Sequence, residues 1–196
     1  MPVEENKYLG YWSYLREDWF ECDNIDEILN ILCQEKGGRI GLWWDKRDIC
    51  LSIHSDEMKQ PEFVNYLNIS VDQVYFRGLE GNEMAIQLIE INKYLYNFLD
   101  FFYGYGEYGI GMVGGPPATR YADAKLGSIK TIYWTNFFGP QLVEKFGKEK
   151  LLSSPSYITE ELADGGIMLV RSPNPFTIDE PCIKAETIEK HLGIKR

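Results

Sequence analysis

The amino-acid sequence predicts an α+β fold in which a mostly antiparallel sheet packs against a long central helix and several shorter helices. Three observations lead to this prediction. Segments in the N-terminal third alternate apolar and polar residues with the period of a strand. One long segment has the apolar spacing of a helix. Short apolar segments in the C-terminal half are separated by glycine- and proline-containing turns. No repeat or low-complexity linker divides the chain, so a single domain over residues 1–196 is expected.

The first elements are expected to be a strand, an acidic connector and a helix. Segment 8–15 is aromatic and favours a strand, and the acidic segment 17–23 is expected to connect it to the helix. The helix is predicted over 25–35, with Asn24 as its cap and Gly37-Gly38 as its end. Its apolar residues share one stripe and are Ile25, Ile28, Leu29, Leu32 and Cys33.

A meander of antiparallel strands is predicted next. Apolar and polar residues alternate over 39–44 and again over 48–54, and the polar residues 45–48 between them are expected to form a hairpin loop. Segment 66–76 alternates in the same way and is expected to be a third strand.

The strongest helical pattern covers 83–101, with Asn82 as the expected cap. This helix is apolar on more than one side, which is typical of a helix buried between layers. The later elements are shorter. They are expected, in chain order, to be a strand at 129–138, a helix at 141–146, a hairpin of 157–161 with 166–171, and a helix at 185–191.

The net charge and the composition argue against nucleic acid and membranes as partners. The formal net charge is −10, and residues 1–62 hold 14 acidic and 7 basic residues, a net of −7. Such a surface is a poor partner for nucleic acid and favours a basic protein, although many acidic proteins carry this charge only for solubility. No leader-like or membrane-spanning apolar run is present, and the four cysteines are scattered. We therefore expect a cytoplasmic protein that does not associate with membranes.

An acidic run near the N-terminus is one candidate binding surface. Six carboxylates fall within eleven residues, with Trp19 and Phe20 among them. An aromatic anchor surrounded by charge is typical of a protein-binding hot spot. A pair of catalytic carboxylates, or simply a solvated face, would also fit this pattern. The residues that we expect to bind a partner here are Glu17, Asp18, Trp19, Glu21 and Asp23.

A tyrosine- and glycine-rich stretch at 103–117 is the second candidate. It contains a G-x-G-x-x-G spacing, but a phosphate-binding loop needs a strand before the motif and a helix after it, and here a helical pattern precedes it. Tyrosines on a glycine-rich loop resemble recognition surfaces, and the alternative is that they fold back on the core. The expected binding residues are Tyr103, Tyr105, Glu107 and Tyr108.

The sequence contains no convincing catalytic, cofactor or metal-binding set. Only His54 and His191 could supply imidazole ligands, and they are far apart in the sequence, so a histidine-based metal site is not expected. Cys50 and His54 would lie about 13 Å apart on one strand, too far for direct proton transfer. Trp134 and Asn136 are expected to be core residues, with the indole N–H and the amide bonded internally.

The order of motifs over residues 82–170 is similar to that of bacterial immunity proteins from polymorphic toxin and type VI secretion systems. It resembles the α+β families in which a W-x-N strand is followed by a short helix. The motifs are a helix entering the Tyr-Gly turn at 103–109, TIYWTNFFG at 131–139, LVEKFG at 142–147, Leu151-Leu152, Pro155, and DGGI at 164–167. The resemblance implies a non-enzymatic protein that binds a cognate toxin domain and occludes its active site.

Two other functions remain open at this point. A small hydrolase or nucleotide-using enzyme would place its site around residues 104–115, with Glu107 lining a pocket. A carbohydrate-binding module would use exposed aromatic residues such as Trp43 and Trp44. The identity of the toxin and the oligomeric state do not follow from the sequence.

Overall fold

The computed structural model describes most of the chain, which divides into two compact units, residues 1–72 and 73–196. The prediction of a single domain stays a prediction. The described residues are 7–13, 16–21, 27, 30–31, 34, 37–44, 49–56, 66–71, 76–77, 80, 81–99, 102–107, 128–177 and 181–195.

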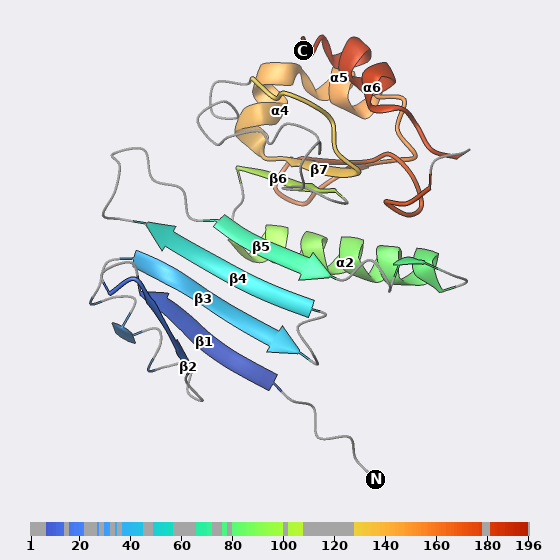
Figure 1. The fold of residues 1–196 in the computed structure, drawn as a ribbon. Coiled ribbons are helices and arrows are strands. Elements are labelled where there is room, and N and C mark those ends of the chain that lie inside the picture. The colour runs from blue at the N-terminus through green and yellow to red at the C-terminus, as the bar shows by residue number, and fades with distance from the viewer. Residues whose placement is uncertain are drawn as a thin grey trace. The chain divides into compact units, whose positions relative to one another are not determined.

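The first unit contains a five-stranded antiparallel sheet with the order β2-β1-β3-β4-β5 (Figure 1). Its strands are β1 (Lys7–Ser13), β2 (Asp18–Glu21), β3 (Gly37–Trp44), β4 (Ile49–Asp56) and β5 (Tyr66–Val71). The predicted hairpin is confirmed, because Trp44 is paired with Ile49 and the alternating residues of β3 and β4 lie opposite one another.

The acidic segment after β1 is a strand, so the prediction of a connector is wrong. Asp18–Glu21 forms β2 and pairs with β1 at the edge of the sheet, with Trp19 opposite Trp12. The chain reverses through Glu17, whose φ of 53° lies in the left-handed region. Trp19 and Phe20 have high β propensity, and this outweighs the acidic composition around them.

The region of the predicted first helix is helical at Glu27, Asn30, Ile31 and Gln34. The five residues of its apolar stripe lie outside the described residues. Gly37 and Gly38 do not end the helix as predicted, because they belong to β3, where they are paired with Asp56 and Ser55.

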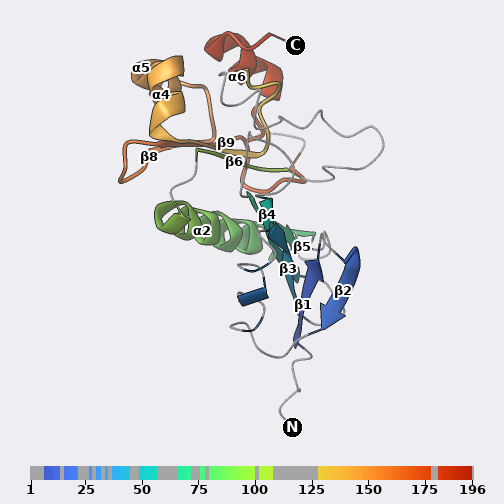
Figure 2. The ribbon, with the colours of Figure 1, turned by 90° about the vertical axis from the view of Figure 1, so that its left-hand side faces the viewer.

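The second unit is built in three layers. Its sheet has four antiparallel strands in the order β6-β7-β9-β8, with α2 on one face and three shorter helices on the other (Figures 1 and 2). The elements are α2 (Gly81–Leu99), β6 (Tyr103–Gly106), β7 (Thr135–Phe138), α4 (Pro140–Phe146), α5 (Lys148–Leu152), β8 (Ile158–Glu161), β9 (Ile167–Val170) and α6 (Ala185–Leu192). The predicted α+β class is confirmed, although the described strands form two sheets.

The main core of the second unit lies between the sheet and the three shorter helices. Phe138, Ile167 and Leu169 project to this face, where they are fully buried. Apolar residues of all three helices complete the cluster. Its members are Ile129, Ile132, Phe138, Leu142, Val143, Leu151, Ile167, Leu169, Ala185, Ile188 and Leu192.

Helix α2 packs on the opposite face of this sheet. The ring of Tyr96 stacks on Phe137 with centroids 5.7 Å apart, and its hydroxyl donates to Asp164 over 2.9 Å. The helix begins at Gly81, so the prediction of Asn82 as its cap is wrong. A Cβ at Gly81 would collide with the carbonyl of Phe76, which explains why glycine occupies the first position.

The predicted strand at 129–138 is much shorter in the structure, where only Thr135–Phe138 is extended as β7. The preceding residues are held by side chains instead of a ladder. The side-chain NH₂ of Asn136 donates to the backbone carbonyl of Tyr133 at 2.9 Å, and the side-chain oxygen of Asn136 accepts from the backbone N–H of Tyr133 at 3.1 Å. Polar side chains therefore replace the strand pairing that composition alone predicts.

The C-terminal elements largely agree with the sequence predictions. The hairpin of β8 and β9 and the helices α4 and α6 are confirmed. Helix α6 ends at Gly193, whose φ of 76° is the left-handed conformation expected of a C-terminal glycine. Helix α5 was not predicted; it begins directly after Gly147, whose φ of 90° redirects the chain between α4 and α5.

Candidate functional site

Three of the acidic residues predicted to bind a partner lie at the edge strand β2: Asp18 and Glu21 belong to the strand, and Glu17 lies in the turn directly before it. Glu17, Asp18 and Glu21 are all exposed. Phe20 is half-buried, and the guanidinium of Arg16 lies 5.4 Å from the centre of its ring. The backbone of Trp19 belongs to β2, but its side chain and all of Asp23 lie outside the described residues. Three of the five predicted residues are therefore placed at the solvent-exposed border of one sheet.

An acidic edge strand combines unpaired backbone groups with negatively charged side chains. An edge strand presents backbone N–H and C=O groups that can pair with another chain, and charged side chains oppose such pairing between identical copies. The carboxylates of β2 repel a second acidic copy and attract a basic segment. This strand can therefore discriminate between partners by charge.

The glycines of the Tyr-Gly stretch are explained by packing within the sheet. Residues 103–106 form β6, so the prediction of a loop is wrong for these four residues. Gly104 lies opposite Phe137 and Gly106 opposite Thr135. A Cβ on Gly106 would lie 2.7 Å from the hydroxyl oxygen of Thr135, closer than a side chain tolerates. Gly106 thus allows the edge strand to approach β7, whereas a Cβ on Gly104 would make only ordinary contact with Phe137. Gly109 lies outside the described residues.

The two described tyrosines of this stretch fold back on the core. Tyr103 packs against Phe138 with ring centroids 5.8 Å apart, and Tyr105 stacks on Tyr133 at 4.1 Å with nearly parallel planes. Both are half-buried. Burial raises the pKa of Tyr105, and the neighbouring Tyr133 adds to the effect. The role of Tyr103 and Tyr105 in partner binding stays a prediction, and Tyr108 lies outside the described residues.

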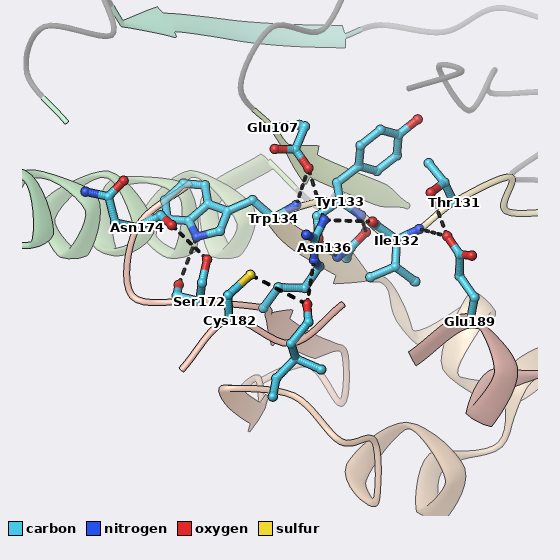
Figure 3. A network of polar contacts seen from close by, with 12 residues as sticks. Glu107, Thr131, Ile132, Tyr133, Trp134, Asn136, Ser172, Asn174, Cys182 and Glu189 are labelled. Carbon is cyan, nitrogen blue, oxygen red and sulfur yellow. Dashed lines mark hydrogen bonds and ion pairs between the residues drawn. The ribbon is translucent and has the colours of Figure 1, made fainter. Parts of the chain in front are cut away.

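Glu107 joins three strand ends in a polar network (Figure 3). Its Oε2 accepts a hydrogen bond from the backbone N–H of Trp134 at 3.0 Å and lies 3.3 Å from Nη1 of Arg171. Only 12% of the Glu107 side chain is exposed. Arg171 also donates to the carbonyls of Ile183 and Ile132, at 3.0 and 3.4 Å. The observed contacts of Glu107 therefore organise the sheet, whereas its predicted part in partner binding remains a prediction.

Sequence reasoning missed the charged partners in this region. Arg171 is separated from Glu107 by 64 residues, and no local pattern connects them. Glu189, on α6, is 3% exposed and accepts hydrogen bonds from the hydroxyl of Thr131 at 2.6 Å and the N–H of Ile132 at 3.1 Å (Figure 3). The only available signal was a glutamate among the apolar positions of α6, next to Ile188 and Leu192.

The internal roles predicted for Trp134 and Asn136 are confirmed. The indole N–H of Trp134 donates to the carbonyl of Ser172 at 2.9 Å (Figure 3). The ring of Trp134 also meets Phe76 edge-on. Asn136 is fully buried and uses both ends of its amide on Tyr133. These residues hold the segment before β7 in one conformation.

Ser153 and His191 form a contact that resembles a nucleophile and base. Ser153 Oγ lies 3.3 Å from Nε2 of His191, and the same nitrogen lies 2.8 Å from the carbonyl oxygen of Lys150. Because a carbonyl oxygen only accepts, Nε2 carries the proton and has no lone pair for the serine. In this arrangement His191 satisfies a carbonyl at the end of α5 and does not activate Ser153.

Within the described ranges, no three residues among His, Cys, Asp and Glu are grouped so that they could hold a metal ion. Among the helices of the same ranges, none combines the length and apolar content that crossing a bilayer requires. Comparison with protein-family models, curated proteins and solved structures found no match to this chain.

Proposed function

We propose that this protein is an immunity protein that binds a cognate toxin domain and blocks its active site without covalent chemistry. The observation that carries the proposal is the acidic sheet edge at β2, where Asp18 and Glu21 on the strand and Glu17 in the turn before it are all exposed. A strand of this kind combines electrostatic attraction with backbone groups that can pair with a partner.

The charge of the chain favours a basic partner. The net charge of −10 creates a negative potential that accelerates encounter with a positively charged protein and opposes binding to nucleic acid. A toxin domain that acts on nucleic acid would present a basic active-site surface. Covering that surface with acidic side chains would exclude the substrate, so inhibition needs no catalytic group on this chain.

The resemblance over residues 82–170 supports the same function, because immunity proteins of this kind act by binding. The proposed setting is the cytoplasm of the producing cell, where such a protein would protect the cell against its own toxin. The alternative, a small enzyme around residues 104–115, would require a role for Glu107 beyond its contacts with Trp134 and Arg171.

Co-expression tests this proposal. The product of the neighbouring reading frame is expressed alone and together with this chain, and growth is followed. We expect the neighbouring product to arrest growth and this chain to relieve the arrest. A triple variant with Glu17→Gln, Asp18→Asn and Glu21→Gln should protect less well than a control that neutralises three exposed carboxylates elsewhere, Glu144→Gln, Glu149→Gln and Glu186→Gln. Growth arrest that this chain does not relieve, or a harmless neighbouring product, would contradict the proposal.

A further inference from the structure

We infer that the outward face of α2 is a second docking surface for the same basic partner, an inference that rests on the proposed function. The face carries three large apolar side chains in contact with solvent. Ile86 is 57% exposed, Ile91 50% and Tyr94 70%. Exposed apolar side chains grouped on one element mark an interaction surface more often than isolated ones do.

The exposed residues of α2 form one continuous arc along the helix. Successive residues advance by about 100°, so positions three and four apart share a face. The arc consists of Asn82, Glu83, Ile86, Gln87, Glu90, Ile91, Tyr94 and Asn97. The opposite side holds Ala85, Ile89 and Tyr96, which are at most 5% exposed, and Tyr96 is stacked on the sheet. Burial against the sheet therefore does not account for the apolar residues of the arc.

The charge on this arc selects the kind of partner. Glu83 and Glu90 lie among the apolar residues, and the arc contains no lysine or arginine. Lys93, beside the arc, lies 2.8 Å from Glu160 and 3.3 Å from Glu90. A hydrogen bond to Glu160 is the largest of the effects that raise its pKa, so Lys93 stays charged and its charge is already paired. Lys93 partly offsets the charge of Glu90, and Glu83 leaves the arc with a net negative charge, so the arc fits a basic, partly apolar protein surface.

A second copy of this chain fits the arc less well. Two such helices would bring Glu83 and Glu90 of one copy towards the same acidic residues of the other, and like charges in an interface cost binding energy. Tyr94, flanked by Ile91 and Ile86, supplies the aromatic anchor that hot spots favour. We therefore assign the arc to the basic toxin domain.

The test measures binding of the purified toxin domain from the neighbouring reading frame to the full chain. The double variant Ile86→Ala and Tyr94→Ala removes the anchors at positions that are already exposed. The matched control is Leu152→Ala and Tyr157→Ala, which truncates the same kinds of side chain, 38% and 44% exposed, elsewhere in the same unit. We expect the α2 variant to raise Kd by about tenfold or more and the control to change it by less than about twofold. Thermal denaturation of both variants checks that each remains folded.

Three other outcomes overturn the inference, and they are distinguishable. Unchanged affinity of a folded α2 variant, with tight binding by the wild type, would leave the proposed function standing and remove α2 from the interface. Absence of binding by the wild type would remove both proposals. Sedimentation that shows a wild-type dimer dissociated by Tyr94→Ala would assign the arc to a second copy of the chain.

Discussion

Nη1 of Arg171 lies 3.3 Å from Oε2 of Glu107 across the ends of β9 and β6, and the same carboxylate oxygen accepts the N–H of Trp134. The pair is largely shielded, with 20% and 12% of the two side chains exposed. A shielded ion pair is costly to break on one side only, because the remaining charge stays without its partner. This relationship connects three segments that are distant in the sequence.

Removing one partner of this pair should destabilise the protein. We expect Glu107→Gln and Arg171→Met each to lower the free energy of unfolding by about 2 kcal/mol. The double variant should lose clearly less than the sum of the two, because each single variant leaves one shielded charge without its opposite charge. Urea denaturation of the four proteins gives the coupling energy. Additive losses would show that the two side chains do not stabilise each other.

The packing of β6 on β7 should be sensitive to one methyl group. Gly106→Ala places a Cβ 2.7 Å from Oγ1 of the buried Thr135, and we expect a loss of about 1–3 kcal/mol from overpacking. Thr135 Oγ1 has no hydrogen-bond partner among the described residues, so removing it opens space without breaking a bond there.

The double variant Gly106→Ala with Thr135→Ala should therefore recover much of the stability lost by Gly106→Ala alone. Thermal denaturation of the two single variants and the double variant checks this expectation. If Thr135→Ala does not improve the Gly106→Ala protein, the contact between these residues is not what requires glycine at position 106.

The half-buried Tyr105 should make stability fall at high pH. Burial raises the pKa of its phenol in the folded state, so the folded state favours the neutral form. Stability is therefore fully present below the ordinary tyrosine pKa of about 10 and is lost as pH rises from there towards the folded-state pKa.

Urea denaturation between about pH 8 and pH 11 tests this effect. The free energy of unfolding should fall more steeply for the wild type than for Tyr105→Phe. The variant Tyr157→Phe, which loses a phenol that is 44% exposed, is the control. Identical slopes for the wild type and Tyr105→Phe would contradict the account.

The carboxylates of β2 should govern how fast the partner binds. We expect the triple variant of Glu17, Asp18 and Glu21 to lower the association rate constant by about tenfold at low salt, with a smaller change in dissociation. The difference should shrink as salt screens the charges. Stopped-flow binding to the purified toxin domain at several salt concentrations measures both effects. A rate deficit that persists unchanged in high salt would point to lost shape complementarity.

Elements with a regular apolar spacing could be predicted from the sequence, whereas elements that depend on contacts between distant residues could not. The β3–β4 hairpin and α6 were predictable because their apolar spacing and turn residues act locally. β2 was missed, since its aromatic residues are surrounded by acids and its pairing with β1 depends on the reversal at Glu17. The strand predicted at 129–138 was too long, because the side chains of Asn136 and Glu189 hold residues 131–133 outside the strand ladder.

The candidate binding residues were predictable to a lesser degree. The acidic run located the exposed carboxylates Glu17, Asp18 and Glu21, because charge density is visible in composition, and their part in binding stays a prediction. The tyrosines of β6 have the composition of a recognition loop, but Tyr103 and Tyr105 pack on Phe138 and Tyr133, a relationship that only the sheet register shows. The helix at 83–101 was expected to be buried between layers, and the exposure of Ile86, Ile91 and Tyr94 is apparent only in the structure.

A titration of the toxin domain's own catalytic activity with purified protein tests whether this protein inhibits by docking. Inhibition by docking predicts that activity falls in proportion to added protein and reaches its minimum near molar equivalence, with both proteins recovered chemically unchanged. Toxin activity that is undiminished at a large molar excess of this protein would contradict the account.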